Sequence, residues 1–279
     1  MSNKIDENLI LWRYMDFTKF VSLLESQSLY FCRADLLKSL DPYEGCLSIV
    51  EKQICNDPLL LNSYKDPTTG EEGYIGYINN HARFIFASCW HNFDYENYLM
   101  WKTYGLNNSS IAIKISLGDL IDSFNNTLDI TPYNIKYIDY EKKFFPISIS
   151  IGTGNSAIDY YTRKAKYFES EKELRLIYEI TPENFESKKE KRKIEYHKNN
   201  PEKEGWIDGV FIPINLETLL KEIYICPSGD KWFEKLVENV INTYKQKHQL
   251  EFDTKINNSK LSRKHNEQFT TQIPCTIPH

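Results

Sequence analysis

The sequence predicts an α+β protein with a split sheet of mixed and antiparallel strands flanked by helices. Apolar runs of strand length recur along the chain, and segments with helical spacing of apolar residues lie between them. Tyr (19) and Phe (15) dominate the aromatic residues, which favours β-rich structure over a helical bundle. No repeat and no break in composition divides the 279 residues. We therefore expect one domain over residues 1–250 and a polar C-terminal tail over residues 251–279.

The first half of the chain alternates strands and helices. Asp16 follows an apolar run and precedes helical spacing, so it is expected to cap a helix. The sequence DPYEG at Asp41–Gly45 is rich in acids and helix breakers and predicts a turn. The expected elements are, in order, a strand, a helix, two strands, a helix and a strand: Leu9–Tyr14, Asp16–Leu24, Ser28–Ala34, Arg83–Trp90, Tyr95–Tyr104 and Ser110–Ile115.

The second half continues the pattern and ends in an amphipathic helix that Ser228 is expected to cap. Before it we expect a short helix from Ser116, followed by six segments in chain order. They are a strand at Asn134–Ile138, a helix at Ala157–Phe168, a strand at Lys172–Glu179, a charged excursion at Glu186–Lys198 and strands at Trp206–Pro213 and Lys221–Cys226. In the last helix one apolar stripe holds Trp232, Leu236, Val240 and Tyr244, and its neighbour holds Phe233, Val237 and Ile241. The spacing predicts that these stripes face the core.

The segment Lys164–Glu179, KAKYFESEKELRLIYE, carries the strongest functional signal. Side chains alternate along a strand, so Leu174 and Leu176 share one face while Glu173 and Arg175 share the other. A strand that anchors a core with one face and presents a carboxylate and a guanidinium on the other is suited to the floor of an active-site cleft. The alternative is an ion pair across strands or at the surface.

Charge and cysteine usage bound the class of protein. A net charge of −5 argues against a surface that is basic throughout, although Lys188–Lys193 offers a local basic lip for a nucleic acid. The six cysteines have no C-x-x-C spacing, and Cys89 with His91 alone is a weak indication of a metal site. We expect no metal, no secretory signal, no membrane span and a cytoplasmic location.

Six short motifs, in this order along the chain, resemble one bacterial family, domain of unknown function 2971. The resemblance extends roughly from Leu9 to Val240, and the family label carries no activity. The motifs are LWRY at Leu11–Tyr14, LYFCRAD at Leu29–Asp35, DPYEG at Asp41–Gly45, SCW at Ser88–Trp90, MWKTY at Met100–Tyr104 and EKELRLIYE at Glu171–Glu179.

The layout more distantly resembles the ADP-ribosyltransferase superfamily. There a first strand bears His or Arg, a second strand carries an aromatic motif, and a late strand presents Glu; the counterparts are Arg13, Tyr30 and Glu173. The sequence departs from that pattern in having Arg where His is commoner and in lacking a Ser-Thr-Ser motif. Glu171 stands two residues before Glu173, the spacing of the E-x-E pair in which the earlier acid helps to select a protein acceptor.

This resemblance implies a protein that uses NAD as a substrate. One carboxylate would stabilise the ribosyl cation, and fixed donors and aromatic rings would hold the dinucleotide. The implied catalytic residues are Glu173 and Glu171; the implied NAD-binding residues are Arg13, Tyr14, Tyr30, Arg33, Trp101, Tyr104 and Arg175, with Asp41 and Glu44 as further candidates. The implied role is a bacterial toxin or phage-defence effector. It would modify a macromolecular acceptor or consume NAD, and an antitoxin or defence protein is a possible partner.

Two other functions fit the residue types. Asp41, Glu44, Glu171 and Glu173, with Lys172, contain the acids and the lysine that a metal-dependent nuclease would need. A non-catalytic module that binds a nucleotide or a protein would use the Glu173–Arg175 pair as scaffold only.

Overall fold

The first strand and the first helix form where the sequence predicts them. Strand β1 spans Ile10–Asp16 and helix α1 spans Phe17–Ser26. The Asp16 carboxylate accepts a hydrogen bond from the Lys19 N–H at 2.8 Å, so it caps the helix as expected. Ser116 caps α5 (Leu117–Asp122) in the same way, with its Oγ accepting from the Asp119 N–H at 3.1 Å.

The computed structural model describes residues 5–39, 41–55, 78, 81–105, 108–125, 128–142, 156–180 and 207–262. The chain divides into two units, each assembled from separate stretches of sequence. Unit 1 comprises Met1–Leu29, His91–Asn126 and Pro213–His279, and unit 2 comprises Tyr30–Trp90 and Thr127–Ile212. Because the stretches interleave, no single cut in the sequence separates the units. This is consistent with a sequence that has no break in composition.

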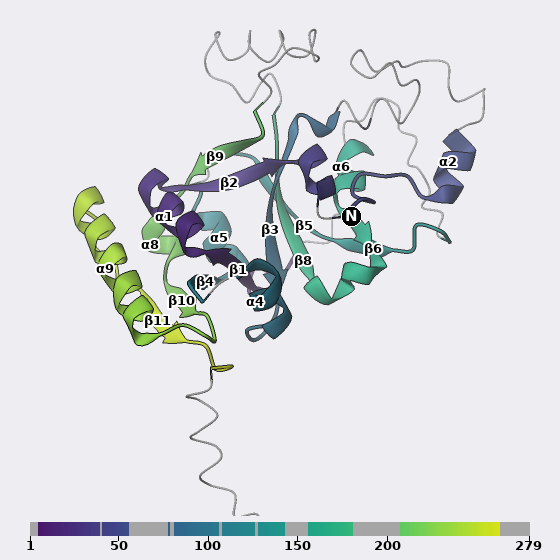
Figure 1. The fold of residues 1–279 in the computed structure, drawn as a ribbon. Helices are drawn as coiled ribbons and strands as arrows, with labels where there is room; N and C mark the ends of the chain where they lie inside the picture. Colours follow the sequence, from purple (N-terminus) through teal and green to yellow (C-terminus); the bar gives the residue numbers. More distant parts are fainter. Residues whose placement is uncertain are drawn as a thin grey trace, which may run out of the picture. The chain divides into compact units, whose positions relative to one another are not determined.

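Unit 1 contains a mixed sheet with the strand order β11-β10-β4-β1. Strand β4 (Ser110–Ser116) pairs antiparallel with β1 and with β10 (Glu222–Ile225), whereas β11 (Lys255–Asn258) runs parallel to β10. Helix α4 (Tyr98–Tyr104) packs on β1, and α1 packs on α9 (Lys231–His248) (Figure 1). The short helices α5 and α8 (Leu216–Leu219) pack on each other. The predicted arrangement of a mixed sheet flanked by helices is therefore present.

Strand β11 lies within the segment expected as a polar tail. Its sequence, KINN, has one apolar residue and no strand pattern, which is why composition predicts no structure there. As an edge strand it takes its stability from backbone pairing with β10, from Glu222↔Lys255 to Ile225↔Asn258. Side-chain character therefore gives little sign of it.

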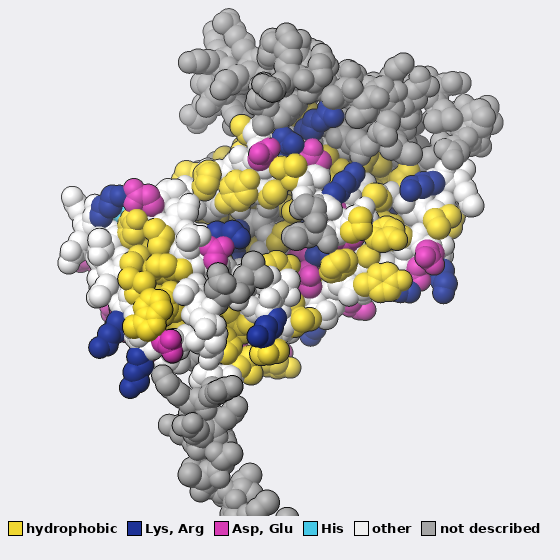
Figure 2. Space-filling model, in the orientation of Figure 1, with side chains coloured by type: hydrophobic (Ala, Val, Ile, Leu, Met, Phe, Trp, Pro, Cys, Tyr) yellow, Lys and Arg dark blue, Asp and Glu magenta, His cyan; other side chains and the backbone are white. Residues whose placement is uncertain are grey.

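Helix α9 buries only one of the two stripes expected to face the core. Phe233, Val237 and Ile241 are buried, whereas Trp232 is 59% exposed and Leu236 is 37% exposed. The prediction for the Trp232 stripe is wrong because helical spacing defines two adjacent apolar stripes but not which one meets the core. Figure 2 shows apolar side chains along this helix at the left of the view. The N-cap is Asp230, two residues after the predicted Ser228.

Unit 2 is built around strand β8 (Glu173–Glu179), which pairs antiparallel with β5 (Ile130–Asn134), from Ile130↔Tyr178 to Asn134↔Leu174 (Figure 1). Strand β8 also pairs with β3 (Ile85–Asn92), which pairs antiparallel with β2 (Ser28–Arg33). Strand β9 (Gly209–Pro213) lies next to β2. Helix α2 (Ile49–Cys55) and the 3-10 helix η1 (Ala34–Ser39) also belong to this unit.

The helix expected at Ala157–Phe168 is replaced by three elements. Helix α6 (Ser156–Tyr161) ends at a short strand β7 (Arg163–Ala165), and the 3-10 helix η2 (Lys166–Glu171) follows. Strand β7 pairs parallel with β6 (Lys136–Ile138), a partner almost thirty residues earlier in the chain. This non-local pairing overrides the local helical spacing.

The charged excursion Glu186–Lys198, with its basic lip Lys188–Lys193, lies outside the described residues. None of the helices in the described part of the chain has the length and apolar character needed to cross a membrane.

Candidate functional site: a buried charge centre in unit 2

Strand β8 places two charged side chains side by side in the interior of unit 2. Glu173 and Arg175 are two positions apart, so their side chains leave the strand on the same face. Both are almost fully buried, with exposed fractions of 4% for Glu173 and 1% for Arg175. Their face of the strand was expected to be open as the floor of a cleft; instead both faces of β8 are covered.

The Arg175 guanidinium binds three groups. Its Nε donates to Glu173 Oε1 at 2.6 Å, and its Nη2 donates to Glu173 Oε2 at 3.3 Å. Its Nη1 donates to the Tyr161 carbonyl at 2.7 Å and forms a short ion pair with Glu44 Oε1. A planar guanidinium can meet a carboxylate with two parallel N–H groups, so Arg175 fixes the orientation of Glu173.

Lys164, on strand β7, connects the two acids of the E-x-E pair. Its Nζ donates to Glu171 Oε2 at 2.7 Å and to Glu173 Oε2 at 3.1 Å. Lys172, between the two acids, has a left-handed backbone with φ of 42°, and this bend separates the end of η2 from the start of β8. One ammonium therefore holds Glu171 and Glu173 together although they belong to different elements.

The DPYEG turn supplies the third carboxylate. Asp41 accepts hydrogen bonds from the Tyr43 N–H at 2.9 Å and, across the unit, from the Ala165 N–H at 3.2 Å. Gly45 has φ of +66°, and a Cβ there would lie 2.4 Å from the Tyr161 ring. The positive φ and the close approach of the Tyr161 ring both require glycine at this position. The turn places Glu44 beside Arg175.

In the Glu173, Glu44 and Lys164 side chains, burial and the neighbouring charges shift the pKa in opposite directions. Burial alone would raise the pKa of Glu173, but the charges of Arg175 and Lys164 lower it far below its usual range. Burial raises the pKa of Glu44, and Arg175 offsets this only in part. Burial would lower the pKa of Lys164, but Glu173 and Glu171 raise it. The pKa shifts therefore keep Glu173 ionised more firmly than Glu44.

We call Glu44, Glu171, Glu173, Arg175 and Lys164 the charge centre. With all five side chains ionised, three carboxylates face two cations, which leaves an excess of one negative charge. Such a centre favours a cationic group over an anionic one.

Sequence reasoning assigned no role to Lys164, which is central here, and considered Cys89 only beside His91, whereas its thiol bonds to Glu173. Burial, chiefly, raises the pKa of the Cys89 thiol. Sequence reasoning also did not predict the buried ion pair of Arg163 and Glu51, in which Arg163 Nη1 and Glu51 Oε1 are 2.8 Å apart. A signal was present: only Thr162 separates Arg163 and Lys164 from the aromatic pair Tyr160-Tyr161, and an exposed charged stretch would be expected to have polar neighbours.

Three of the candidate NAD-binding residues come together in unit 1. Tyr14 and Trp101 pack edge to face with ring centroids 4.9 Å apart, and Tyr104 packs on the partly buried edge of the same apolar cluster. The Tyr14 hydroxyl accepts from the Asn97 N–H at 2.8 Å. His91 lies between Tyr14 and Tyr104, with centroid distances of 6.1 and 5.0 Å.

Arg13 precedes Tyr14 on β1, so their side chains leave the strand on opposite faces. Tyr30 and Arg33 belong to unit 2 and have structural contacts there. The Tyr30 ring covers Gly209 and packs on Phe211 with centroids 5.2 Å apart. Arg33 pairs with Asp35 at 2.7 Å and donates to the Ile207 carbonyl at 3.1 Å.

The candidates are thus divided between the two units. Arg13, Tyr14, Trp101 and Tyr104 belong to unit 1, and Tyr30, Arg33, Asp41, Glu44, Glu171, Glu173 and Arg175 belong to unit 2. A common cleft for Arg13, Tyr30 and Glu173 stays a prediction. Among the described residues, no three His, Cys, Asp or Glu side chains are grouped as ligands for a metal ion.

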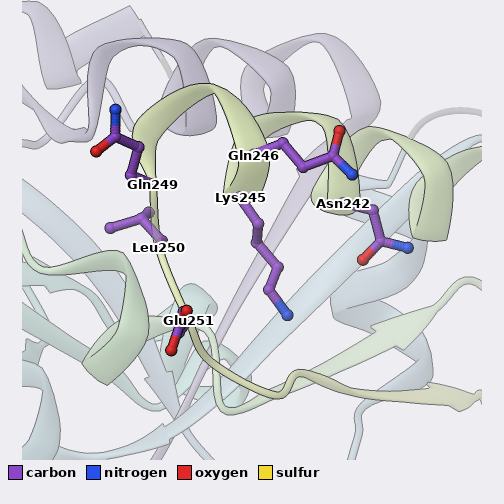
Figure 3. A pocket seen from close by; sticks show the side chains of 6 residues that line it. All are labelled: Asn242, Lys245, Gln246, Gln249, Leu250 and Glu251. Carbon is purple, nitrogen blue, oxygen red and sulfur yellow. The ribbon is translucent and has the colours of Figure 1, made fainter.

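A shallow hollow of about 460 Å³ lies at the end of α9 (Figure 3). In this view the side chains of Asn242 and Lys245 extend from the helix toward the segment that follows it. Lys245 already donates to the Phe252 carbonyl and lies over the Phe252 ring, 5.0 Å from its centroid. The hollow is therefore bounded by a lysine that holds the chain after α9 in place.

Residues 100–176 match the model of the family DUF2971. Its description is "Protein of unknown function (DUF2971)". The match supports the resemblance to this family from α4 to Leu176 on β8, a range that contains the motif Met100–Tyr104 and most of the motif Glu171–Glu179. It includes Lys164, Glu171, Glu173 and Arg175, four of the five residues of the charge centre. Among curated proteins, no sequence similar to this chain is found.

Proposed function

We propose that this protein is an ADP-ribosyltransferase-like enzyme that cleaves the bond between nicotinamide and ribose in NAD. ADP-ribose is transferred to a macromolecule or to water. The observation that carries the proposal is the Lys164 ammonium, which binds Glu171 and Glu173 together and so gives the E-x-E pair a fixed geometry. The proposed fold class is that of the ADP-ribosyltransferases.

The chemistry assigns one role to each acid. When the C1′–N bond breaks, its electron pair leaves with neutral nicotinamide, and positive charge develops on the ribose. The Glu173 carboxylate stabilises that charge. An acceptor oxygen or nitrogen then bonds to C1′ and gives its proton to Glu171 or to solvent.

The electrostatics support Glu173 in this role. Its lowered pKa means that the carboxylate is charged at any physiological pH, as a stabiliser of a cation must be. Arg175 and Lys164 reduce the negative potential, but Glu44 and Glu171 restore an excess of one negative charge. Arg175 and Lys164 are then positioning residues, which hold the acids in place and do not touch the reacting atoms.

The test is nicotinamide release from NAD by the wild type, Glu173→Gln and Glu169→Gln. Glu169 is an exposed acid on η2, so its replacement is a matched control. We expect Glu173→Gln to lose about 100-fold or more of the activity, and the control to lose none. Thermal unfolding of each variant separates loss of activity from loss of fold.

Glu171→Gln provides a second variant if Glu173→Gln does not fold. It should lower transfer to an acceptor more than hydrolysis by water, because Glu171 is assigned to the acceptor. Full turnover by folded Glu173→Gln, or no turnover by the wild type at millimolar NAD, contradicts the proposal. NAD binding without turnover would instead favour a non-catalytic nucleotide-binding module.

The proposed biological role is that of a bacterial toxin or phage-defence effector acting in the cytoplasm, restrained by an antitoxin or a defence-system partner. Expression in bacteria should then lower cellular NAD or label a macromolecule. Cells that express Glu173→Gln should grow normally.

A further inference from the structure

A second cavity, of about 840 Å³, lies in unit 1, and none of its lining residues belongs to the charge centre. Three pieces of chain form its walls: helix α4, the loop between β10 and α9, and the turn after β11. The residues that line it are Tyr98, Trp101, Lys102, Gly105, Cys226, Pro227, Ser228, Gly229, Asp230, Asn258, Ser259, Leu261 and Ser262. Its size suits a ligand of several hundred daltons.

The wall on the Trp101 side is held by one buried carboxylate. Glu96 Oε2 accepts from Trp101 Nε1 at 3.0 Å and from Ser259 Oγ at 2.5 Å, and Glu96 Oε1 accepts from the Lys260 N–H. These bonds tie the start of α4 to the turn after β11. Two walls that come from distant parts of the sequence are therefore fixed relative to each other before any ligand enters.

The loop that opens α9 offers hydrogen-bond donors. The Phe233 and Glu234 N–H groups donate to the Asp230 carbonyl, whereas the Lys231 and Trp232 N–H groups have no acceptor within the helix and are not bound by the Asp230 carboxylate. That carboxylate instead accepts from Trp232 Nε1 at 3.3 Å. Across the cavity Lys102 contributes an exposed ammonium, and Ser228 and Ser262 contribute hydroxyls.

The cavity also has a flat aromatic surface. Tyr98 is 58% exposed, and the Lys102 ammonium lies 5.5 Å from its ring centroid. A planar base can stack on such a ring, and an anionic group one or two bonds further on can reach the same ammonium. Lys102 is the one cation and Asp230 the one carboxylate among the described lining residues, so a ligand with few charges is favoured.

We propose that this cavity binds a nucleotide, with its base on Tyr98 and its phosphate between Lys102 and the loop Pro227–Asp230 that leads into α9. The inference concerns unit 1 alone and does not depend on NAD cleavage at the charge centre. Phosphates that carry one negative charge each, as in a pyrophosphate, suit the single lysine better than a terminal dianion.

The experiment is a calorimetric titration of the full chain with ADP-ribose, AMP, adenosine and inorganic phosphate. ADP-ribose should bind most tightly, and adenosine and inorganic phosphate should each bind at least about tenfold more weakly. Lys102→Met should weaken ADP-ribose binding about 10- to 100-fold, the effect of one charge-assisted hydrogen bond. Tyr98→Ala should weaken it comparably.

Two matched controls keep the test specific. Lys235→Met removes an exposed lysine from α9, and Tyr95→Ala removes a tyrosine that is 73% exposed just before α4; neither residue lines the cavity. Both should bind ADP-ribose as the wild type does.

The proposal is overturned if ADP-ribose does not bind the wild type at millimolar concentration. It is also overturned if adenosine or inorganic phosphate binds as tightly as ADP-ribose, or if a control substitution weakens ADP-ribose binding as much as Lys102→Met or Tyr98→Ala does. Glu173→Gln should bind as the wild type does, so loss of turnover in that variant with binding retained separates this site from the proposed catalysis.

Discussion

At the scale of residues, the stability of the interior of unit 2 depends most on the Glu173 side chain. Two cations bind it, and the Tyr137 hydroxyl accepts a hydrogen bond from its backbone N–H at 2.6 Å. Taking such a charge out of water is costly, and the cost is offset only while its partners remain. The same contacts that orient the carboxylate for the proposed chemistry therefore also link its charge to the stability of the fold.

This linkage predicts how stability changes with pH. The folded pKa of Glu173 is lowered, so its contribution is present above the unfolded pKa of about 4.3 and is lost as the pH falls. At pH 6, Glu173→Gln should be less stable than the wild type by on the order of 3 kcal/mol. The gap should narrow steadily between about pH 5 and pH 3. Urea unfolding at several pH values measures it.

The exposed acid Glu169 again provides the control. Glu169→Gln should track the wild type at every pH, because that carboxylate is exposed. A gap for Glu173→Gln that stayed constant down to pH 3 would mean that the Glu173 charge contributes nothing to the difference.

At the scale of elements, helix α9 carries two apolar stripes of similar spacing, one buried and one largely exposed. Its buried stripe packs Phe233 against Phe17, with ring centroids 5.3 Å apart. Its other stripe leaves Trp232 more than half exposed. Hydrophobic spacing alone assigns both stripes to the core, and only the position of α1 decides between them.

We therefore expect opposite results for neighbouring aromatic residues on this helix. Phe233→Ala should cost about 3–5 kcal/mol of unfolding free energy, since it removes a fully buried ring. Trp232→Ala should change stability by less than about 0.5 kcal/mol. Denaturant midpoints of the two variants provide the comparison, and equal losses would place Trp232 in a buried contact.

Local signals predicted much of the fold, and long-range contacts account for what they missed. Asp16 and Ser116 begin their helices as expected because capping depends on residues three positions away. Strand β7 was not predicted because its partner β6 is distant in the sequence. The sequence predicted that Glu173 and Arg175 share one face of a strand, and they do. A third member of the charge centre, Glu44, lies 131 positions from Arg175, and no periodicity connects them.

For the whole molecule, removal of metal ions separates the proposed ADP-ribosyltransferase from a metal-dependent nuclease. Cleavage of NAD by one carboxylate and fixed donors needs no metal, so we expect activity to survive EDTA. Nuclease chemistry would lose its activated nucleophile with the metal. Incubation of NAD labelled in its adenylate half with cell lysate and EDTA tests this, and Glu173→Gln is the control.

Transfer of label to protein or nucleic acid supports the ADP-ribosyltransferase, and release of labelled ADP-ribose alone supports an NAD glycohydrolase. Strand cleavage that EDTA abolishes, without any transfer of label, would replace both with a nuclease.

Strand β11 has a practical consequence for anyone who shortens this protein. It pairs along β10, whose Ile223 and Ile225 are fully buried. A chain cut after residue 250, where the sequence turns polar, would lose β11 and leave a row of unpaired N–H and C=O groups beside an apolar strand. Such an edge recruits strands from other molecules. The shortened protein would then be lost as aggregate during purification, and an inactive preparation would reveal nothing about the role proposed for Glu173.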